Sequence, residues 1–305
     1  MSDKEQLKSL LIQLLDKFVE VCEANGLRYY LAYGSALGAV RHQGLIPWDD
    51  DIDVVMPRVD YEKLYELDSS VWGDGYRLCS YRNTPQYVHD FMKVENLNTT
   101  LIEVANPVYV GGVYIDIFPL DNVPNKEADD KMTKGASYYA SRKWLFYSEP
   151  IPRKYLLKYL RYCVKRNLFI HNDEMRKWDE LTKRYINVQS EYVKDYHCAY
   201  LHKAPLPMNV YGNGIKLLYE GKEYMAPQDY HTYLTHYYKN YMEFPPIEKR
   251  NSGHDWKYLN LSHRLTEEEL NPIIKELTSA YHYSFSFNVE IKSIFDKICR
   301  LITQK

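Results

Sequence analysis

The chain has 305 residues, enough to bury a substantial core as one large domain or as a catalytic domain with an extension. Hydrophobic residues make up 45% and charged residues 26% of the sequence, ordinary globular values that exclude a disordered chain, a collagen-like repeat and a coiled-coil rod. The formal net charge of -2 provides no overall basic field, so we expect no nucleic-acid partner.

The helix and strand patterns of the first sixty residues are clear. Apolar residues from Leu7 to Cys22 recur at helical spacing and predict an amphipathic helix over 4–24. Residues 28–33 predict a short strand that ends at a Gly34-Ser35 turn, with a short helix leaving that turn. Residues 51–56 predict a second strand beside the first, and Pro57 allows a helix to follow it.

Further strands are expected at 76–81, 89–95, 99–104 and 113–118, each bounded by Gly, Pro or Asn. From 126 to 192 the pattern becomes helical and charged, and a last amphipathic helix is expected over 286–302. We therefore predict an α+β fold: a mixed β-sheet flanked by helices, an added helical region and an irregular C-terminal segment. The expected division is a catalytic core at 1–124 and a part at 125–305 that completes the substrate site.

The cysteines and the amino terminus indicate the cellular compartment of the protein. The five cysteines lie far apart and form no CxxC or Cys/His ligand spacing, which favours a reducing environment. The amino terminus, MSDKEQLKSL, has no apolar signal core, and no apolar run approaches the ~18 residues of a membrane span. We expect a cytoplasmic protein.

Four carboxylates within residues 49–53 directly precede an apolar strand. Side chains two apart in a strand share a face, so Asp51 and Asp53 are expected to project together. Their repulsion is costly without a cation, and carboxylate oxygens suit Mg²⁺ or Mn²⁺. A solvated acidic loop is the alternative interpretation of this motif alone.

Other residues favour a phosphate and metal site. Gly34 permits close backbone approach and a positive φ, and Ser35 adds a hydroxyl at a helix start whose free N–H groups attract phosphate. Asp116 lies in an apolar strand, where a carboxylate needs a metal or a structural partner such as Arg or loop amides. Arg41 and Lys93 are the nearest cations, and each could contact phosphate. Alternatively, Arg41 is a surface side chain and Lys93 is a snorkelling strand lysine.

Three carboxylates around one or two divalent ions form a clamp for in-line attack at phosphorus. In this arrangement Asp51 and Asp53 would hold the ions, and Asp116 would share a metal or take the proton from the acceptor. A Gly-Ser turn, a DxD strand and a lone strand Asp together resemble the pattern of the nucleotidyltransferase superfamily.

Residues 33–53, YGSALGAVRHQGLIPWDDDID, resemble the signature of the LicD family, bacterial phosphocholine transferases related to the fukutin-type proteins. Segments 93–103, 113–121, 221–227 and 243–250, with His254, also resemble that family. The resemblance implies a nucleotidyltransferase-type sheet and transfer of phosphocholine, or a similar phospho-alcohol, from a CDP-linked donor such as CDP-choline. The acceptor would be a hydroxyl of a cell-surface glycan precursor, such as one of teichoic acid or lipopolysaccharide, and CMP would be released.

The same resemblance implies roles for individual residues. Asp51, Asp53 and Asp116 would be the catalytic and metal-binding residues, with Mg²⁺ or Mn²⁺ as the cofactor and two ions expected. The donor and phosphate contacts would be Gly34, Ser35, Arg41, Lys93, Arg250 and His254. Two alternatives stay open: a nucleotidyltransferase that adds NMP to a sugar or small acceptor, and a non-catalytic glycan- or nucleotide-binding module.

Segment 153–166 contains six basic residues and no acidic one. As a helix it would place its cations on one face, either solvated on a docked helix or lying on an anionic membrane. The second case would bring the protein to the inner face of the membrane, where a lipid-linked glycan acceptor would be found.

Overall fold

The computed structural model describes residues 2–105, 108–147, 171–252 and 254–279. The predicted basic segment 153–166 and the predicted helix over 286–302 lie outside the described residues. Within the described part, mixed strands combine with helices, so the α+β class is confirmed. No helix of that part is long and apolar enough to cross a membrane.

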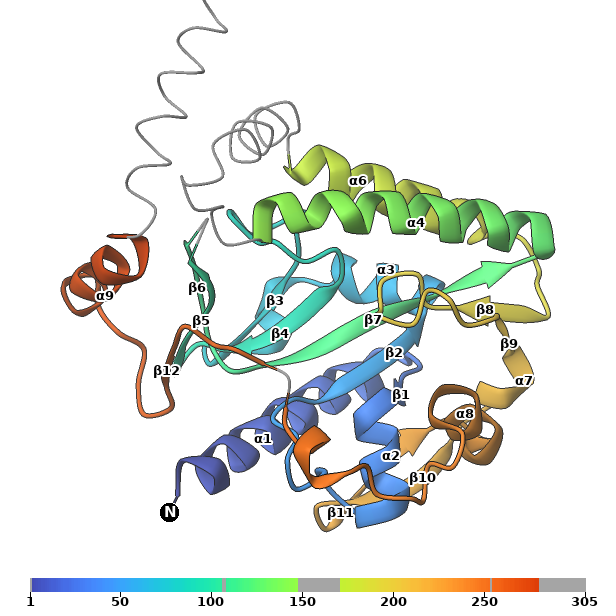
Figure 1. The fold of residues 1–305 in the computed structure, drawn as a ribbon, viewed down its shortest axis with the longest axis horizontal. Helices are drawn as coiled ribbons and strands as arrows, with labels where there is room; N and C mark the ends of the chain where they lie inside the picture. Colours follow the sequence, from blue (N-terminus) through green and yellow to red (C-terminus); the bar gives the residue numbers. More distant parts are fainter. Residues whose placement is uncertain (1, 106–107, 148–170, 253, 280–305) are drawn as a thin grey trace, which may run out of the picture.

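A central sheet carries the segments that the sequence motifs occupy (Figure 1). Its main strand order is β1-β2-β7-β4-β3, and β8 and β9 extend it from the far end of β7. β2 and β7 run parallel, with Asp53 opposite Asp116, whereas the other pairings are antiparallel. The strands are β1 (Tyr30–Leu31), β2 (Asp53–Pro57), β3 (Tyr76–Cys79), β4 (Met92–Asn96), β7 (Tyr114–Val123), β8 (Tyr192–Lys194) and β9 (Leu206–Pro207).

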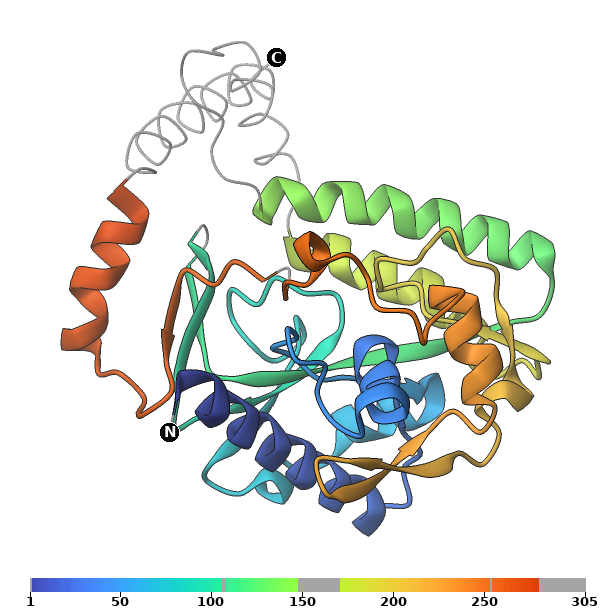
Figure 2. The same cartoon turned by 60° about the horizontal axis from the view of Figure 1, so that its bottom comes forward.

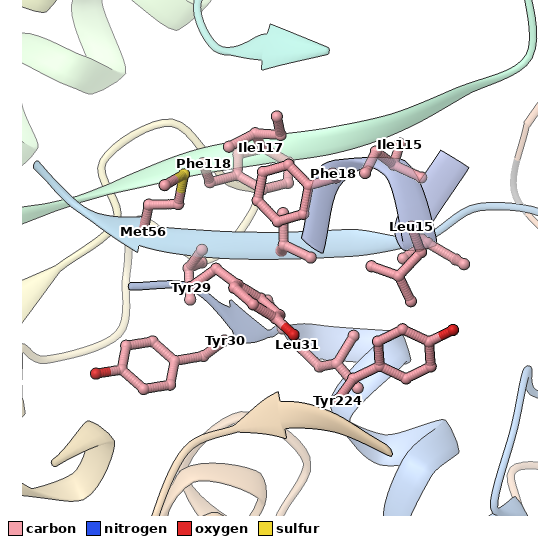
Figure 3. Close-up of a cluster of buried hydrophobic side chains, with 14 of the residues drawn as sticks. Leu15, Phe18, Tyr29, Tyr30, Leu31, Met56, Ile115, Ile117, Phe118 and Tyr224 are labelled. Carbon is pink, nitrogen blue, oxygen red and sulfur yellow. The ribbon is translucent and has the colours of Figure 1, made fainter. Parts of the chain in front are cut away.

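Helix α1 (Asp3–Ala24) buries its apolar stripe against this sheet. Ser2 begins the helix with a capping box, in which its side chain and that of Glu5 each satisfy the other's backbone N–H. Figure 3 shows Leu15 and Phe18 of α1 in the same apolar cluster as Leu31 and Ile115 of the sheet. The amphipathic helix predicted from the Leu7–Cys22 pattern is confirmed.

The remaining helices surround the sheet. In Figure 1, α4 and α6 run side by side above the sheet, and α1 and α2 lie below it. A second, smaller core joins α4 and α6 through Met132, Trp178 and Tyr196. The helices are α2 (Tyr33–His42), α3 (Arg58–Glu66), α4 (Lys126–Tyr147), α6 (His171–Thr182), α7 (Met208–Tyr211), α8 (Tyr230–Tyr238) and α9 (Glu267–Ser279), with 3-10 turns at Ser69–Trp72, Lys183–Tyr185 and Ile247–Lys249.

Two small sheets complete the described fold. One contains β12 (Tyr258–Asn260), β5 (Thr100–Ala105) and β6 (Val108–Gly111), and the other is the hairpin of β10 (Ile215–Tyr219) and β11 (Lys222–Ala226). Side chains of the later segments, among them Tyr219, Tyr224 and Tyr233, belong to the same core as α1 and the main sheet. The division at 124/125 stays a prediction.

The structure corrects several boundaries. Helix α2 begins at Tyr33, so Gly34 lies in its first turn instead of in a turn before it, whereas Ser35 lies in the first turn of the helix as expected. Strand β2 begins at Asp53, which leaves Asp51 in the preceding loop. Strand β7 continues to Val123, past the expected end at 118, because its last residues pair with β8. Strand β6 was not predicted.

Candidate active site

Parallel pairing of β2 and β7 brings the predicted carboxylates together. Asp53 opens β2 and lies directly opposite Asp116 of β7, and Asp51 precedes β2 by two residues. One carboxylate oxygen from each of these three residues lies within 4.8 Å of the other two. The three-carboxylate arrangement that the sequence predicts is therefore present, although Asp51 reaches it from a loop.

Electrostatic strain is concentrated in this carboxylate triad. Burial, with repulsion from the neighbouring carboxylates, raises the pKa values of Asp51 and Asp53 well above their ordinary range. Burial also raises the pKa of Asp116 to about 6, although Lys93 opposes the shift. Carboxylates that lie close together with raised pKa values favour a functional site.

The donor set fits a divalent metal. Asp116 Oδ1 is buried and has no hydrogen-bond partner among the described residues, and its nearest cation is Lys93 Nζ at 3.4 Å. Three carboxylates offer the oxygen ligands that Mg²⁺ and Mn²⁺ prefer. Asp51, Asp53 and Asp116 are therefore the residues that could hold such an ion.

A second group of possible ligands shares one member with the triad. Ligand atoms of Asp50, Asp51 and His254 also lie within 4.8 Å of one another. His254 Nδ1 is 2.6 Å from Asp50 Oδ1, and this contact raises the pKa of His254 to about 9. The structure thus brings His254 to the carboxylates from 204 positions along the chain.

Lys93 lies beneath the triad. Its side chain is only 1% exposed, so the interpretation of a snorkelling lysine is wrong. Its ammonium lies 2.9 and 3.0 Å from the two oxygens of Glu103 and 3.2 Å from the ring centroid of Tyr114. Sequence reasoning missed Glu103, although a glutamate in a predicted apolar strand is the same signal that identified Asp116.

The Gly34-Ser35 segment differs from its predicted geometry. The positive φ, 42°, is at Tyr33 and not at Gly34. Gly34 leaves room for Asp49, because a Cβ at position 34 would lie 2.7 Å from Asp49 Oδ2 and would displace that side chain. Ser35 Oγ accepts the backbone N–H of Asp53 at 2.9 Å, so this hydroxyl holds the start of β2 against α2.

Tyr33 is a positioning residue that sequence reasoning missed. A tyrosine in the left-handed region is strained and persists only where its surroundings hold it. Its hydroxyl donates to Asp195 Oδ2 at 2.7 Å, and its backbone N–H donates to the hydroxyl of Tyr233 at 3.1 Å. Residues from the second half of the chain therefore hold the turn before Gly34.

Arg41 and Arg250 come together on two aromatic rings. Arg41 lies 5.9 Å from the ring centroid of Trp48 and 4.8 Å from that of Phe244, and Arg250 lies 5.3 Å from each. Arg41 donates to the carbonyl of Tyr241 at 2.9 Å, and Arg250 to the carbonyl of Pro245 at 2.8 Å. Neither guanidinium has a carboxylate within 4.0 Å in the described part of the chain, so both keep donors for an anion.

A cluster of tyrosines borders the triad. The rings of Tyr33 and Tyr200 stack with centroids 5.4 Å apart, and Tyr237 and Tyr238 pack against Tyr200. Burial is the main cause that raises the pKa values of Tyr200 and Tyr238, and the charge of Asp53 adds to it. These rings supply an apolar and polarisable wall beside the carboxylates.

Comparison with known proteins gives a consistent result. The family described as LicD/FKTN/FKRP, nucleotidyltransferase domain, matches residues 26–157. The lipopolysaccharide cholinephosphotransferase LicD of Haemophilus influenzae is 26% identical over 80% of this chain and 92% of its own length. Human ribitol 5-phosphate transferase FKRP is 58% identical over 36 residues, which are 12% of this chain and 7% of that protein. The chain therefore contains a segment that matches the LicD/FKTN/FKRP nucleotidyltransferase domain, and its similarity to the Haemophilus LicD protein extends over most of its length.

Proposed function

We propose that this chain is a transferase that moves phosphocholine, or a similar phospho-alcohol, from a CDP-linked donor to a hydroxyl of a cell-surface glycan or teichoic acid precursor. The observation that carries the proposal is the convergence of Asp51, Asp53 and Asp116, with one buried carboxylate oxygen that has no hydrogen-bond partner among the described residues. The names of the Haemophilus and human relatives support a phospho-alcohol as the transferred group, and the Haemophilus name, which includes lipopolysaccharide, supports a glycan as the acceptor.

The proposed reaction makes one bond to phosphorus and breaks another. The acceptor oxygen attacks the phosphorus that bears the alcohol, the bond to the CMP oxygen breaks, and CMP leaves. Bound Mg²⁺ or Mn²⁺, held by the triad, would neutralise phosphate charge and acidify the attacking hydroxyl. Asp116 would share a metal or accept the hydroxyl proton.

The other predicted residues would position the donor. Arg41 and Arg250, whose guanidiniums have no carboxylate within 4.0 Å among the described residues, would contact its phosphates. Gly34 would let the backbone approach the donor. Ser35 would hold the backbone of Asp53, and Lys93 would hold the carboxylates of Glu103 and Asp116. His254 would join Asp50 and Asp51 around the second of two ions. We place this activity in the cytoplasm, at the inner face of the membrane if segment 153–166 contacts lipid.

The experiment measures CMP release with a panel of CDP-alcohols, including CDP-choline and CDP-ribitol. We expect release that requires Mg²⁺ or Mn²⁺, and a loss of about 100-fold or more in Asp53→Asn because a ligand carboxylate is removed. Asp74→Asn makes the same charge change at an exposed site outside the triad and should keep full activity. Full activity in Asp53→Asn would overturn the site assignment. Pyrophosphate release from NTPs would favour the nucleotidyltransferase alternative.

A further inference from the structure

A pocket of about 770 Å³ lies outside the triad, between the start of α4 and residues 192–205. Apolar side chains from both segments form much of its wall: Val123, Pro124, Tyr192, Leu201, Ala204 and Pro205. A volume of this size is typical of sites for small organic ligands. The apolar wall indicates that such a ligand has an apolar portion.

Lysines give the same pocket a positive charge. Four of them line it, Lys126, Lys134, Lys194 and Lys203, together with His202, against only two carboxylates. Both carboxylates already have lysine partners, since Asp130 pairs with Lys126 and Asp129 with Lys194. Lys134 and Lys203 have no carboxylate within 4.0 Å among the residues that the structure describes.

Lys194 is the buried cation of the pocket. It is 6% exposed, and its ammonium donates to Asp129 Oδ1 at 3.0 Å and to Thr133 Oγ1 at 2.9 Å. Among the residues that the structure describes, two acceptors serve its three N–H bonds, which leaves one donor for a ligand. A buried ammonium with an unused donor favours an anionic group at this position.

One segment, residues 195–205, separates the pocket from the candidate active site. Figure 1 shows this loop, between β8 and β9, lying between α4 and α8. Its Asp195 and Tyr200 contact Tyr33 beside the triad, whereas Leu201, the next residue, lines the pocket. Lys203 also donates to the carbonyl of His236 in α8 at 2.8 Å. A ligand in the pocket would therefore lie one loop away from the carboxylates.

We propose that this pocket binds an amphiphile with a phosphate head. The phosphate would lie between Lys134, Lys194 and Lys203, because ammonium groups bind phosphate as point charges. The apolar portion would lie against Leu201 and the neighbouring prolines. In the proposed transferase, on which this role rests, the ligand would be an anionic, apolar part of the acceptor, held near the end of β7 that lies away from Asp116 and across loop 195–205 from the site of transfer.

The test is calorimetric titration of the full chain with decyl phosphate below its micelle concentration. We expect Lys134→Glu and Lys203→Glu each to weaken binding about 10-fold or more, because each reverses an unpaired charge. Lys131→Glu makes the same change at an exposed position of α4 that does not line the pocket, and it should bind within about twofold of the unchanged chain. Circular dichroism checks that each variant is folded.

Two other probes separate the parts of the proposed ligand. Inorganic phosphate and decyl maltoside should each bind at least about 10-fold more weakly than decyl phosphate, because each lacks one of the two interactions. Equal binding by either probe, or no binding of decyl phosphate, would overturn the proposal. Asp53→Asn should bind decyl phosphate as the unchanged chain does, so that a failure of the transferase proposal and a failure of the pocket proposal are distinguishable.

Discussion

Asp116→Asn tests whether the triad is a site of stored electrostatic strain. In metal-free protein the pKa of Asp116 is about 6, compared with about 3.9 for an ordinary aspartate. At about 1.4 kcal/mol for each pKa unit, this difference costs the folded state about 3 kcal/mol once Asp116 is ionised. Because the folded pKa is the higher one, the cost is absent below pH about 4 and complete above pH about 6 to 7.

The variant removes this cost, because asparagine does not ionise, and Lys93 still pairs with Glu103. In EDTA, the free energy of unfolding of Asp116→Asn relative to the unchanged chain should rise by about 2 kcal/mol between pH 4.5 and pH 7.5. Urea unfolding at the two pH values measures this difference. Mg²⁺ at pH 7.5 should stabilise the unchanged chain and have a much smaller effect on the variant.

Asp74→Asn is the matched control, since it removes an exposed carboxylate and should show no such pH dependence. The reasoning would be refuted if the difference in free energy of unfolding between Asp116→Asn and the unchanged chain were the same at both pH values. That result would mean that burial does not disfavour the charged form of Asp116 in the metal-free protein.

Four further changes test other parts of the structure. Arg58→Ala should cost about 3–5 kcal/mol in urea unfolding, because buried Asp121 and Asp179 lose their shared partner. Arg176→Ala, which breaks a pair whose side chains are 52% and 53% exposed, should cost less than about 1 kcal/mol, and similar costs for the two variants would contradict this reasoning. Gly34→Ala should weaken Mn²⁺ binding by calorimetry about 10-fold or more with the fold retained, since its Cβ displaces Asp49, and unchanged affinity would show that this contact is unimportant. His254→Ala should lower the number of bound Mn²⁺ ions from two to one, and an unchanged count would exclude His254 as a ligand. Tyr33→Phe should cost about 1.5–3 kcal/mol of stability through its lost bond to a carboxylate, and a loss below about 0.5 kcal/mol would contradict the positioning role.

Local patterns in the sequence were sufficient for much of the first 124 residues. The helix over 4–24 follows from its apolar spacing, and the strand at 51–56 follows from an apolar run after the acidic loop. Each of these two predictions depends on residues that are separated along the chain by no more than one or two helical turns or strand lengths. The boundary errors, such as the late start of β2 and the extension of β7, arise where strand pairing with a distant segment decides the end.

By itself the sequence determined which residue types the site could use: the Asp51 and Asp53 pair, the isolated Asp116 and the small residues at 34 and 35. Only the tertiary structure decided how they meet. The register of β2 on β7 places Asp53 opposite Asp116, and the later loops bring Asp195 to Tyr33 and His254 to Asp50. It also showed that Gly34 lies against the Asp49 side chain, and that Lys93 is buried against Glu103. Such contacts depend on burial and on pairings between distant segments, and spacing along the chain does not report them.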